Sequence, residues 1–243
     1  MAHNADESLT LQALAGLESS ALSDALEGLG FAHQVLGPQY RPMGGHVRMA
    51  GRAACALLGP KEAPAPGAPL PGDYFAAIDE LAAPGRILVL AIASGTRGAV
   101  LGGFMAREYR KRGAVGVITD GLLRDVAELA TLDLALIATG ATPCNGAKGM
   151  RIDSVRQPLA LGGAHGTPVT VEDGDYVLAD EDGVVVVPAR IVAVAIEATR
   201  VLIEIERRIG ADMAGGLPRV QAMRAHDRFG HLPALRASLA SLR

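Results

Sequence analysis

Several residue types are scarce in this chain of 243 residues, and their scarcity limits what the protein can be. There is no Trp, aromatic residues are 3% of the chain, and Cys55 and Cys144 are the two cysteines. Two cysteines cannot form a disulfide framework, and they do not stand in a CxxC motif for zinc or redox chemistry. We therefore expect both to pack in a core made of the aliphatic residues that dominate the 49% hydrophobic content, in a protein of the reducing cytoplasm.

Long apolar runs and strong net charge are also missing. No uninterrupted run approaches the roughly 18 residues of a membrane span, and no basic segment followed by an apolar one opens the sequence. The net charge of -3 provides no broad positive field for phosphate backbones. We expect neither a membrane nor a nucleic acid as partner.

Common cofactor motifs are absent as well. The six histidines show no i,i+4 pair for a helical zinc site, and no Gly-Lys-Ser/Thr or G-x-G-x-x-G motif opens a helix. The DEDG segment at 180–183 lacks the further ligands of a calcium loop, which favours a tight turn.

Apolar periodicity predicts alternating strands and helices, which are typical of a parallel sheet, followed by short hairpin strands. A loop containing five prolines is expected over 60–72, and Ser19 or Ser20 and Gly30 are expected to bound the second helix. Helices are predicted at 9–17, 20–29, 73–81, 98–112, 125–132 and 189–208, and strands at 47–58, 87–92, 115–119, 134–138, 168–171, 176–180 and 183–187. In the last helix, a broad apolar stripe that includes Val201 is expected to face the core or another subunit. The tail beyond it is weakly patterned.

Arg124 and Asp125 stand side by side just after a predicted strand. Adjacent groups of opposite charge can hold an anion and a cation together, which suits a metal-assisted site for a keto acid. Taken alone, Asp125 with Glu128 also forms a D-x-x-E capping box that would open the next helix. A purely structural role for this pair is therefore an alternative interpretation.

Three ordered segments, PGRILVLAIASGTRGAVLGGFMA, GAVGVITDGLLRD and EDGDYVLADEDGVVVVP, resemble the RraA-like family (regulator of ribonuclease E activity A). The family includes the 4-hydroxy-4-methyl-2-oxoglutarate aldolases, which also decarboxylate oxaloacetate. The resemblance implies one α/β domain over 1–243, with its core at about 20–206, N-terminal helices and a C-terminal helical extension. The implied fold is a swivelling β/β/α domain with mixed sheets, like the phosphohistidine domain. It also implies homotrimers or homohexamers with active sites between subunits.

The resemblance assigns roles to particular residues. Arg124 matches the arginine that binds the pyruvyl portion, and Asp125 matches the ligand of a divalent cation, expected to be Mg²⁺ with Mn²⁺ as an alternative. The substrate-binding segment corresponds to Gly102, Gly103, Phe104 and Met105. A 2-oxo acid can chelate a hard cation, Arg124 can hold the enolate oxygen, and backbone amides near Gly102 can hold the carboxylate. The implied enzyme is a class II carbon–carbon lyase that forms pyruvate through an enolate.

The sequence departs from the family at two places. Many of its aldolases have an acidic residue where this chain has Gly103, and many have an aspartate where it has Ala91 and Ile92. A second acid in the family can come from the neighbouring subunit's C-terminal helix, and Glu204 and Glu206 are both candidates. Two alternatives to the aldolase remain: a non-catalytic protein-binding regulator of ribonuclease activity, and a lyase for a different 2-oxo acid.

Overall fold

The computed structural model describes residues 2–61 and 72–239. Its helices are α1 (Ala2–Ala15), α2 (Ser19–Leu29), α3 (Gly72–Asp79), α4 (Gly103–Lys111), α5 (Val126–Leu129), α6 (Val192–Ala214), α7 (Arg219–Ala225) and α8 (Leu232–Leu239), with short 3-10 helices η1 (Ala147–Gly149) and η2 (Ala189–Ile191). Its strands are β1 (Arg41–Pro42), β2 (Met49–Pro60), β3 (Arg86–Ile92), β4 (Ala99–Leu101), β5 (Gly116–Thr119), β6 (Leu122–Leu123), β7 (Ala135–Ala138), β8 (Gly140–Ala141), β9 (Met150–Val155), β10 (Leu159–Leu161), β11 (Val169–Val171), β12 (Tyr176–Ala179) and β13 (Val184–Val187).

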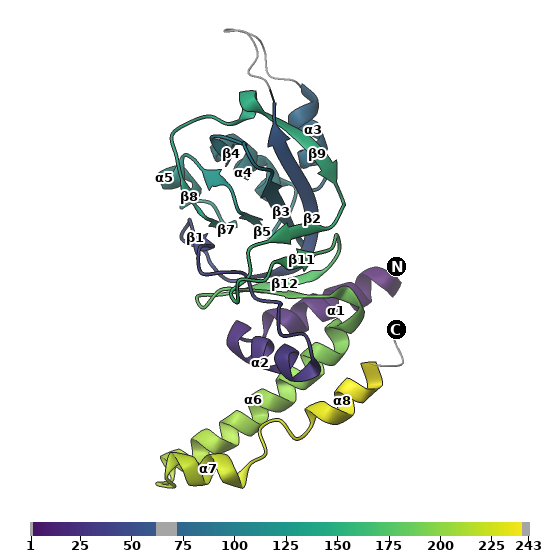
Figure 1. Ribbon diagram of the computed structural model, residues 1–243, viewed down its shortest axis with the longest axis vertical. Helices are drawn as coiled ribbons and strands as arrows, with labels where there is room; N and C mark the ends of the chain where they lie inside the picture. Colours follow the sequence, from purple (N-terminus) through teal and green to yellow (C-terminus); the bar gives the residue numbers. More distant parts are fainter. Residues whose placement is uncertain (1, 62–71, 240–243) are drawn as a thin grey trace.

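A mixed sheet forms the centre of the molecule. Its order is β1-β7-β5-β3-β2-β12-β13, with β9 also paired to β2 (Figure 1). The neighbours β2, β3, β5 and β7 are parallel, whereas β12 and β13 form an antiparallel hairpin. The central strand β3 is a run of apolar residues buried on both faces, as expected when helices or other layers cover a parallel sheet. The predicted α/β class and mixed strand directions are confirmed.

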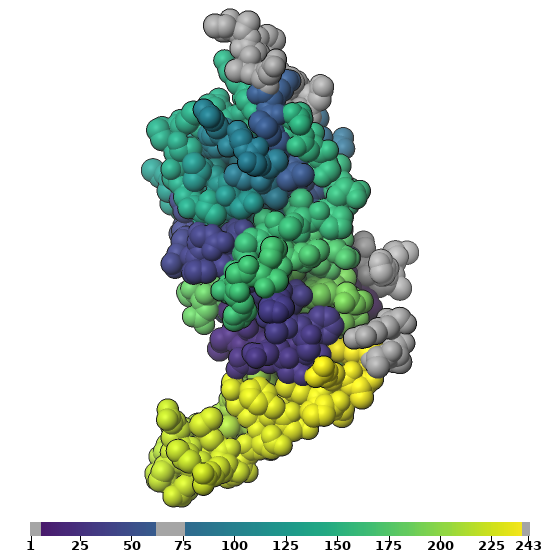
Figure 2. Space-filling view, in the orientation of Figure 1, coloured from purple at the N-terminus to yellow at the C-terminus, as the bar shows by residue number. Residues whose placement is uncertain are grey.

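Helices from both ends of the chain form a layer beside the hairpin β12–β13. Leu22 and Leu26 of α2, Leu202 of α6 and Val187 of β13 belong to one buried apolar cluster. The helix α6 runs away from the sheet towards α7, so the C-terminal helices extend one end of the molecule (Figures 1 and 2). None of the described helices is both long and apolar enough to cross a membrane.

The segment before the predicted binding residues differs from the prediction. A helix was expected over 98–112, but residues 99–101 form β4 and the helix starts at Gly103. The apolar triplet at 99–101 is compatible with either structure in sequence, and its pairing with β6 stabilises the strand. Gly98, at φ +83°, adopts a backbone conformation that suits glycine just before this strand.

Other differences lie in the helices and loops. Glu18 occupies the N-cap position of α2 without a side-chain cap, so the expected serine cap is wrong, whereas Gly30 ends the helix in the left-handed region as predicted. Val201 is 37% exposed and does not belong to the buried stripe of α6.

The weakly patterned tail contains α7 and α8, and strands β9 and β10 were not predicted. Of the proline-containing loop, residues 62–71 lie outside the described residues.

Asp180 joins the N-terminal helices to the hairpin. Its carboxylate accepts hydrogen bonds from the Ser19 hydroxyl at 2.5 Å, the Ser19 amide at 2.8 Å and the Asp182 amide at 3.1 Å. Burial raises the pKa of Asp180, but these hydrogen bonds lower it more, so the pKa lies below its ordinary value. The DEDG segment is thus a turn, as predicted, and its first carboxylate also anchors α2.

We expect Asp180→Asn to lower the free energy of unfolding by ~1.5–3 kcal/mol at pH 7, because hydrogen bonds to a charged acceptor are lost. Because the native pKa lies below the unfolded-state value of about 4, the ionised carboxylate stabilises the fold above that value. This stabilisation is lost as the pH falls from there through the native pKa. The difference from wild type should therefore shrink between pH 5 and pH 3 in urea titrations. Asp182→Asn, at an exposed position of the same turn, is the matched control. Equal unfolding free energies for wild type and Asp180→Asn at pH 7 would contradict this role.

Candidate active site at the start of helix α4

The parallel pairing of β4 and β6 brings the predicted site residues together. Leu101 of β4 is in register with Leu123 of β6, and the Arg124 amide donates a hydrogen bond to the Leu101 carbonyl at 3.1 Å. Parallel strands end at the same edge of a sheet, so the residues that follow each strand become neighbours. Gly102 and Gly103 therefore lie against Arg124 and Asp125.

Asp125 faces helix α4 and does not cap its own helix. Its Oδ2 accepts a hydrogen bond from the Gly103 amide at 3.0 Å, while its side chain makes no cap bond to α5. The capping-box interpretation of Asp125 is therefore wrong. Asp125 has φ 62° and ψ 35°, a left-handed conformation that Asp and Asn adopt more readily than most other residues. This conformation, with 40% of the side chain exposed, presents the carboxylate at the surface beside α4.

Arg124 lies next to this carboxylate and across Gly102. Its Nε is 3.4 Å from Asp125 Oδ2, and its side chain is 30% exposed. A Cβ atom at Gly102 would stand 2.7 Å from Asp125 Oδ2 and 2.9 Å from Arg124 Nε. Real Cβ contacts are not this short, so the glycine is what allows both charged groups to approach the start of the helix.

A cavity of about 280 Å³ opens beside these residues. Arg124 contributes its charged group to a wall that is otherwise mostly apolar, and Met105 is nearly buried whereas Phe104 is 82% exposed. The lining residues are Ala99, Val100, Leu101, Gly102, Phe104, Met105, Arg124, Asn145 and Ala147. Four of the residues predicted to bind substrate thus line one cavity, and Gly103 and Asp125 are hydrogen-bonded to each other next to Gly102 and Arg124.

The carboxylate of Glu128 fills the space above Gly103. A Cβ atom at Gly103 would lie 2.1 Å from Glu128 Oε1 and 2.5 Å from Oε2. Glu128 Oε1 also lies 2.9 Å from Arg107 Nη2. Although this chain lacks an acidic residue at position 103, a carboxylate from α5 occupies the same region.

The donors at this site fit a hard divalent cation. Asp125 and Glu128 supply carboxylate oxygens, and within the described chain Asp125 Oδ1 accepts no hydrogen bond. Mg²⁺ typically binds one or two carboxylates and keeps several waters, so it does not need a cage of protein ligands. No group of three or more His, Cys, Asp or Glu side chains suited to a metal occurs within residues 2–61 and 72–239.

The backbone amides of α4 are not arranged entirely as predicted. The amide of Gly103 donates to Asp125, so it is already used by the protein. The amides of Phe104 and Met105, in the same first turn, have no acceptor among the described residues. These two amides, rather than that of Gly103, are the donors available to an anion at the helix start.

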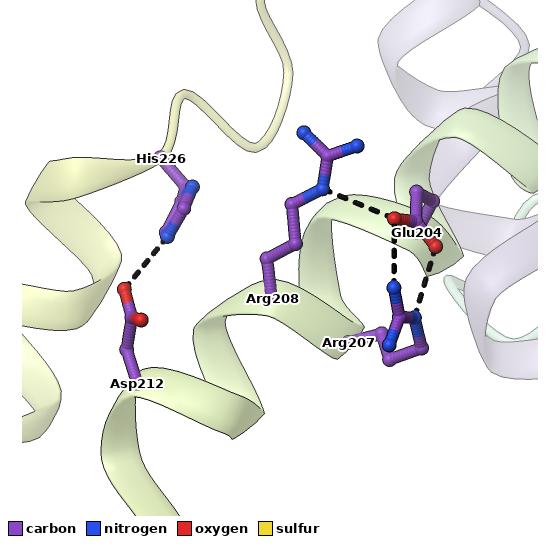
Figure 3. Close-up of polar contacts among 5 residues, drawn as sticks. All are labelled: Glu204, Arg207, Arg208, Asp212 and His226. Carbon is purple, nitrogen blue, oxygen red and sulfur yellow. Dashed lines mark hydrogen bonds and ion pairs between the residues drawn. The ribbon is translucent and has the colours of Figure 1, made fainter. Parts of the chain in front are cut away.

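The C-terminal candidates Glu204 and Glu206 are both held by arginines, on α6 for Glu204 and in the segment between α7 and α8 for Glu206. Glu204 accepts hydrogen bonds from Arg207 and Arg208, each at 3.0 Å (Figure 3). Hydrogen bonds from both arginines lower the pKa of Glu204 to about 2, so it stays ionised at neutral pH. Glu206 accepts a hydrogen bond from Arg228 at 2.6 Å. In the chain itself α6 lies at the other end of the molecule from α4 (Figure 1), and a contribution across subunits stays a prediction.

Two features of the site were not predicted from the sequence. Asn145 and Ala147 line the cavity because Asn145 bridges to Ala99 of β4. The only local signal is the Asn-Gly pair at 145–146, which is typical of a turn. Glu128 had a sequence signal, its spacing of three from Asp125, but that spacing was interpreted as a cap.

Comparison with known proteins gives a consistent result. The family model described as RraA-like, Aldolase/RraA, matches residues 19–186, more than half of the chain. A provisionally named 4-hydroxy-4-methyl-2-oxoglutarate aldolase of Alkalilimnicola ehrlichii is 33% identical over 156 residues, covering 63% of this chain and 85% of that protein. The 4-hydroxy-4-methyl-2-oxoglutarate aldolase of Thermus thermophilus is 36% identical over 104 residues, covering 43% of this chain and 60% of that protein.

Solved structures show the same architecture. An uncharacterized protein of Pseudomonas syringae pv. tomato has a TM-score of 0.77 at 24% identity, covering 90% of this chain and 94% of that one. The RNA-processing inhibitor RraA from Thermus thermophilus has a TM-score of 0.51 at 29% identity, covering 68% of this chain and 92% of that one. The predicted RraA-type α/β fold with mixed sheets is confirmed.

Proposed function

The chain belongs to the RraA-like family, and from this premise we propose that it is a divalent-metal-dependent lyase that releases pyruvate from 2-oxo acids. The proposed substrates are 4-hydroxy-4-methyl-2-oxoglutarate and, in a second activity, oxaloacetate. The observation that carries the proposal is the placement of the Arg124 guanidinium and the Asp125 carboxylate together beside a cavity of about 280 Å³. The names of the aldolase relatives support the choice of substrate.

The proposed reaction breaks the bond between C3 and C4 of the substrate. In the aldol cleavage the C4 hydroxyl loses its proton, C4 becomes the ketone of one pyruvate, and the bonding electrons form the enolate of a second pyruvate. In oxaloacetate the C4 carboxylate leaves as carbon dioxide and the same enolate remains. Protonation of the enolate at C3 then completes pyruvate in both cases. One site can therefore perform both reactions, because both require the same developing negative charge to be stabilised.

The residues of the chain have distinct roles in this proposal. Asp125, with Glu128 nearby, would hold Mg²⁺ or Mn²⁺, which as a Lewis acid withdraws electrons from the ketone. Arg124 offers a planar, permanently charged donor to the oxygen on which the enolate charge develops. The amides of Phe104 and Met105 are positioned to receive the substrate carboxylate at the positive end of α4. The apolar wall near Val100 and Met105 limits the water around the reacting bond.

Assembly into homotrimers or homohexamers is part of the proposal. Several large apolar side chains of the C-terminal region are exposed, among them Met213 of α6, Val220 and Met223 of α7, and Phe229 between α7 and α8, at 42–54%. They lie at the end of the molecule formed by α7 and the segments flanking it (Figure 2). Packing against another copy of the chain would cover this surface.

Release of pyruvate from both substrates tests the proposed function. With Mg²⁺ or Mn²⁺ we expect two pyruvates per 4-hydroxy-4-methyl-2-oxoglutarate and one per oxaloacetate, measured by a coupled lactate dehydrogenase assay. A chelator should reduce turnover by about 10²-fold or more, because a Lewis acid contributes several kcal/mol to stabilising the charge, and excess Mg²⁺ should restore it.

Blanks with the same metal and no protein are required in this assay, because metal ions alone decarboxylate oxaloacetate. Turnover that a chelator does not change would overturn the metal requirement. No release above the blanks with either substrate would overturn the lyase, and the non-catalytic regulator would then be favoured.

A further inference from the structure

Asn145 is the second polar side chain on the wall of the cavity beside Gly102. The described residues that line this cavity are apolar or glycine apart from Arg124 and Asn145. In the proposed reaction Arg124 binds the oxygen on which the enolate charge develops, so it serves the pyruvyl half of the substrate. A 2-oxo acid with a second carboxylate needs another donor for that group. Asn145 is the polar side chain that remains for it.

The side-chain amide of Asn145 is held with its nitrogen free. Its Oδ1 accepts a hydrogen bond from the Ala147 amide at 3.0 Å. A backbone N–H can only donate, so the oxygen must face Ala147 and the two hydrogens of Nδ2 are left for another acceptor. Within the described chain, Nδ2 makes no hydrogen bond. Asn145 therefore offers a donor to a ligand without giving up its bond to the turn.

The loop that carries Asn145 packs tightly against the strand that leads into the site. The Ala99 amide donates a hydrogen bond to the Cys144 carbonyl at 2.9 Å, and Asn145 forms a bridge with Ala99. A Cβ atom at Gly146 would lie 2.6 Å from the Ala99 carbonyl oxygen, so glycine is what permits this approach. Asn145 is thus fixed relative to β4, which ends just before Gly102. A donor that is fixed in advance loses little conformational freedom when it binds a ligand.

We infer that Asn145 is a specificity-determining residue that binds the distal carboxylate of 2-oxo diacids with a five-carbon backbone. This inference rests on the proposed function, because it concerns the substrate of the same site. Oxaloacetate is one carbon shorter, and its C4 carboxylate must leave as carbon dioxide, so a strong hydrogen bond to that carboxylate would oppose the reaction. Asn145 therefore favours the longer substrate. The alternative is that Asn145 only shapes the turn through its bond to Ala147.

Binding of 2-oxoglutarate and of pyruvate, measured by isothermal titration calorimetry with Mg²⁺ present, tests this inference without turnover. Both acids share the 2-oxo acid group, but only 2-oxoglutarate carries the distal carboxylate, and it lacks the C4 hydroxyl that the aldol cleavage requires. We expect Asn145→Asp to weaken 2-oxoglutarate binding by about 10–100-fold, because a hydrogen bond to a charged group is replaced by repulsion between two carboxylates. Pyruvate binding should change by less than about threefold, because the added charge lies far from it and is screened by solvent.

Two variants separate recognition from a structural role. Asn145→Asp keeps a side-chain oxygen that can accept the hydrogen bond from Ala147, so the turn retains this bond. Thr142→Val removes the hydrogen bond that the Thr142 hydroxyl accepts from the Cys144 amide at 3.2 Å in the same loop. Thr142 is not among the residues that line the described cavity. We therefore expect Thr142→Val to keep the wild-type ratio of the two affinities, with thermal unfolding as the check that both variants are folded.

Turnover gives a second readout that a structural role would not produce. In Asn145→Ala, which removes the donor without adding charge, we expect kcat/KM for 4-hydroxy-4-methyl-2-oxoglutarate to fall by about 10–100-fold, mainly through KM. Decarboxylation of oxaloacetate should stay within about threefold of wild type, because its shorter chain does not depend on this donor. Loss of both activities to the same extent would contradict a role in specificity.

The outcomes distinguish this inference from the proposed function. Unchanged 2-oxoglutarate affinity in Asn145→Asp, or equal wild-type affinities for the two acids, would overturn the role of Asn145 and leave the lyase intact. An equal loss of 2-oxoglutarate binding in Thr142→Val would also overturn it, in favour of the turn. Preference for 2-oxoglutarate that depends on Asn145, in a wild type that releases no pyruvate, would overturn the lyase and support the binding role.

Discussion

Asp125→Asn is expected to lower pyruvate release by about 10³-fold from both substrates, because the cation that stabilises the enolate charge loses its main ligand. Asparagine keeps a side-chain oxygen that can accept the hydrogen bond from the Gly103 amide. In the wild type this amide lies 3.0 Å from Asp125 Oδ2. It also tolerates the left-handed backbone at φ 62°, where alanine would be strained. The loss should therefore appear in kcat and in Mn²⁺ affinity, but not in the melting temperature.

Asp133→Asn is the matched control for this prediction. Asp133 is 70% exposed and pairs with Arg110 on the surface. We expect turnover close to that of wild type in this variant, since exposed ion pairs contribute little. Wild-type turnover in Asp125→Asn would contradict the role of Asp125 as a metal ligand, and loss of turnover accompanied by unfolding would show a structural role as the partner of the α4 amide.

Arg124→Ala is expected to reduce kcat/KM by about 10²–10³-fold, the usual result of removing one donor to a developing oxyanion. Arg124→Lys should recover only part of this loss, because lysine retains the charge but not the planar arrangement of donors. Mn²⁺ affinity should stay equal to that of wild type or become tighter, since the positive charge lies 3.4 Å from the proposed ligand. This pattern is the opposite of that expected for Asp125→Asn.

Arg110→Ala, at the end of α4 and in an exposed ion pair, controls for the loss of an arginine. Arg124→Ala with kcat/KM equal to wild type would remove the guanidinium from the proposed mechanism. Weaker Mn²⁺ binding in Arg124→Ala would show that the arginine organises the cation site rather than the substrate.

The parallel core was predictable because its strands are short apolar runs separated by helical segments. The prediction of 87–92 agrees with β3, and that of 115–119 overlaps β5 closely. The strand β4 was not predictable, because its three residues take their conformation from pairing with β6 and Asn145. Tertiary pairing overrides local preference in such short elements.

The adjacency of Arg124 and Asp125 was visible in the sequence, but the direction of the aspartate was not. The D-x-x-E spacing is the same whether Asp125 caps α5 or turns towards α4, and the positive φ at Asp125 decides between the two. The contact between Glu128 and Gly103 depends on the β4–β6 register, which local sequence patterns do not specify. Local sequence patterns therefore identify Arg124 and Asp125 as a candidate pair, but they do not show that Glu128 lies against Gly103.

A crystal structure of the protein with Mn²⁺ and oxalate, a mimic of the pyruvate enolate, tests the central claim most directly. We predict an anomalous difference peak within about 2.3 Å of an Asp125 carboxylate oxygen, with one oxalate oxygen on the Arg124 guanidinium. The Glu128 carboxylate should face the same peak directly or through one water. A peak elsewhere in the molecule, with Asp125 bonded only to the Gly103 amide, would contradict the account.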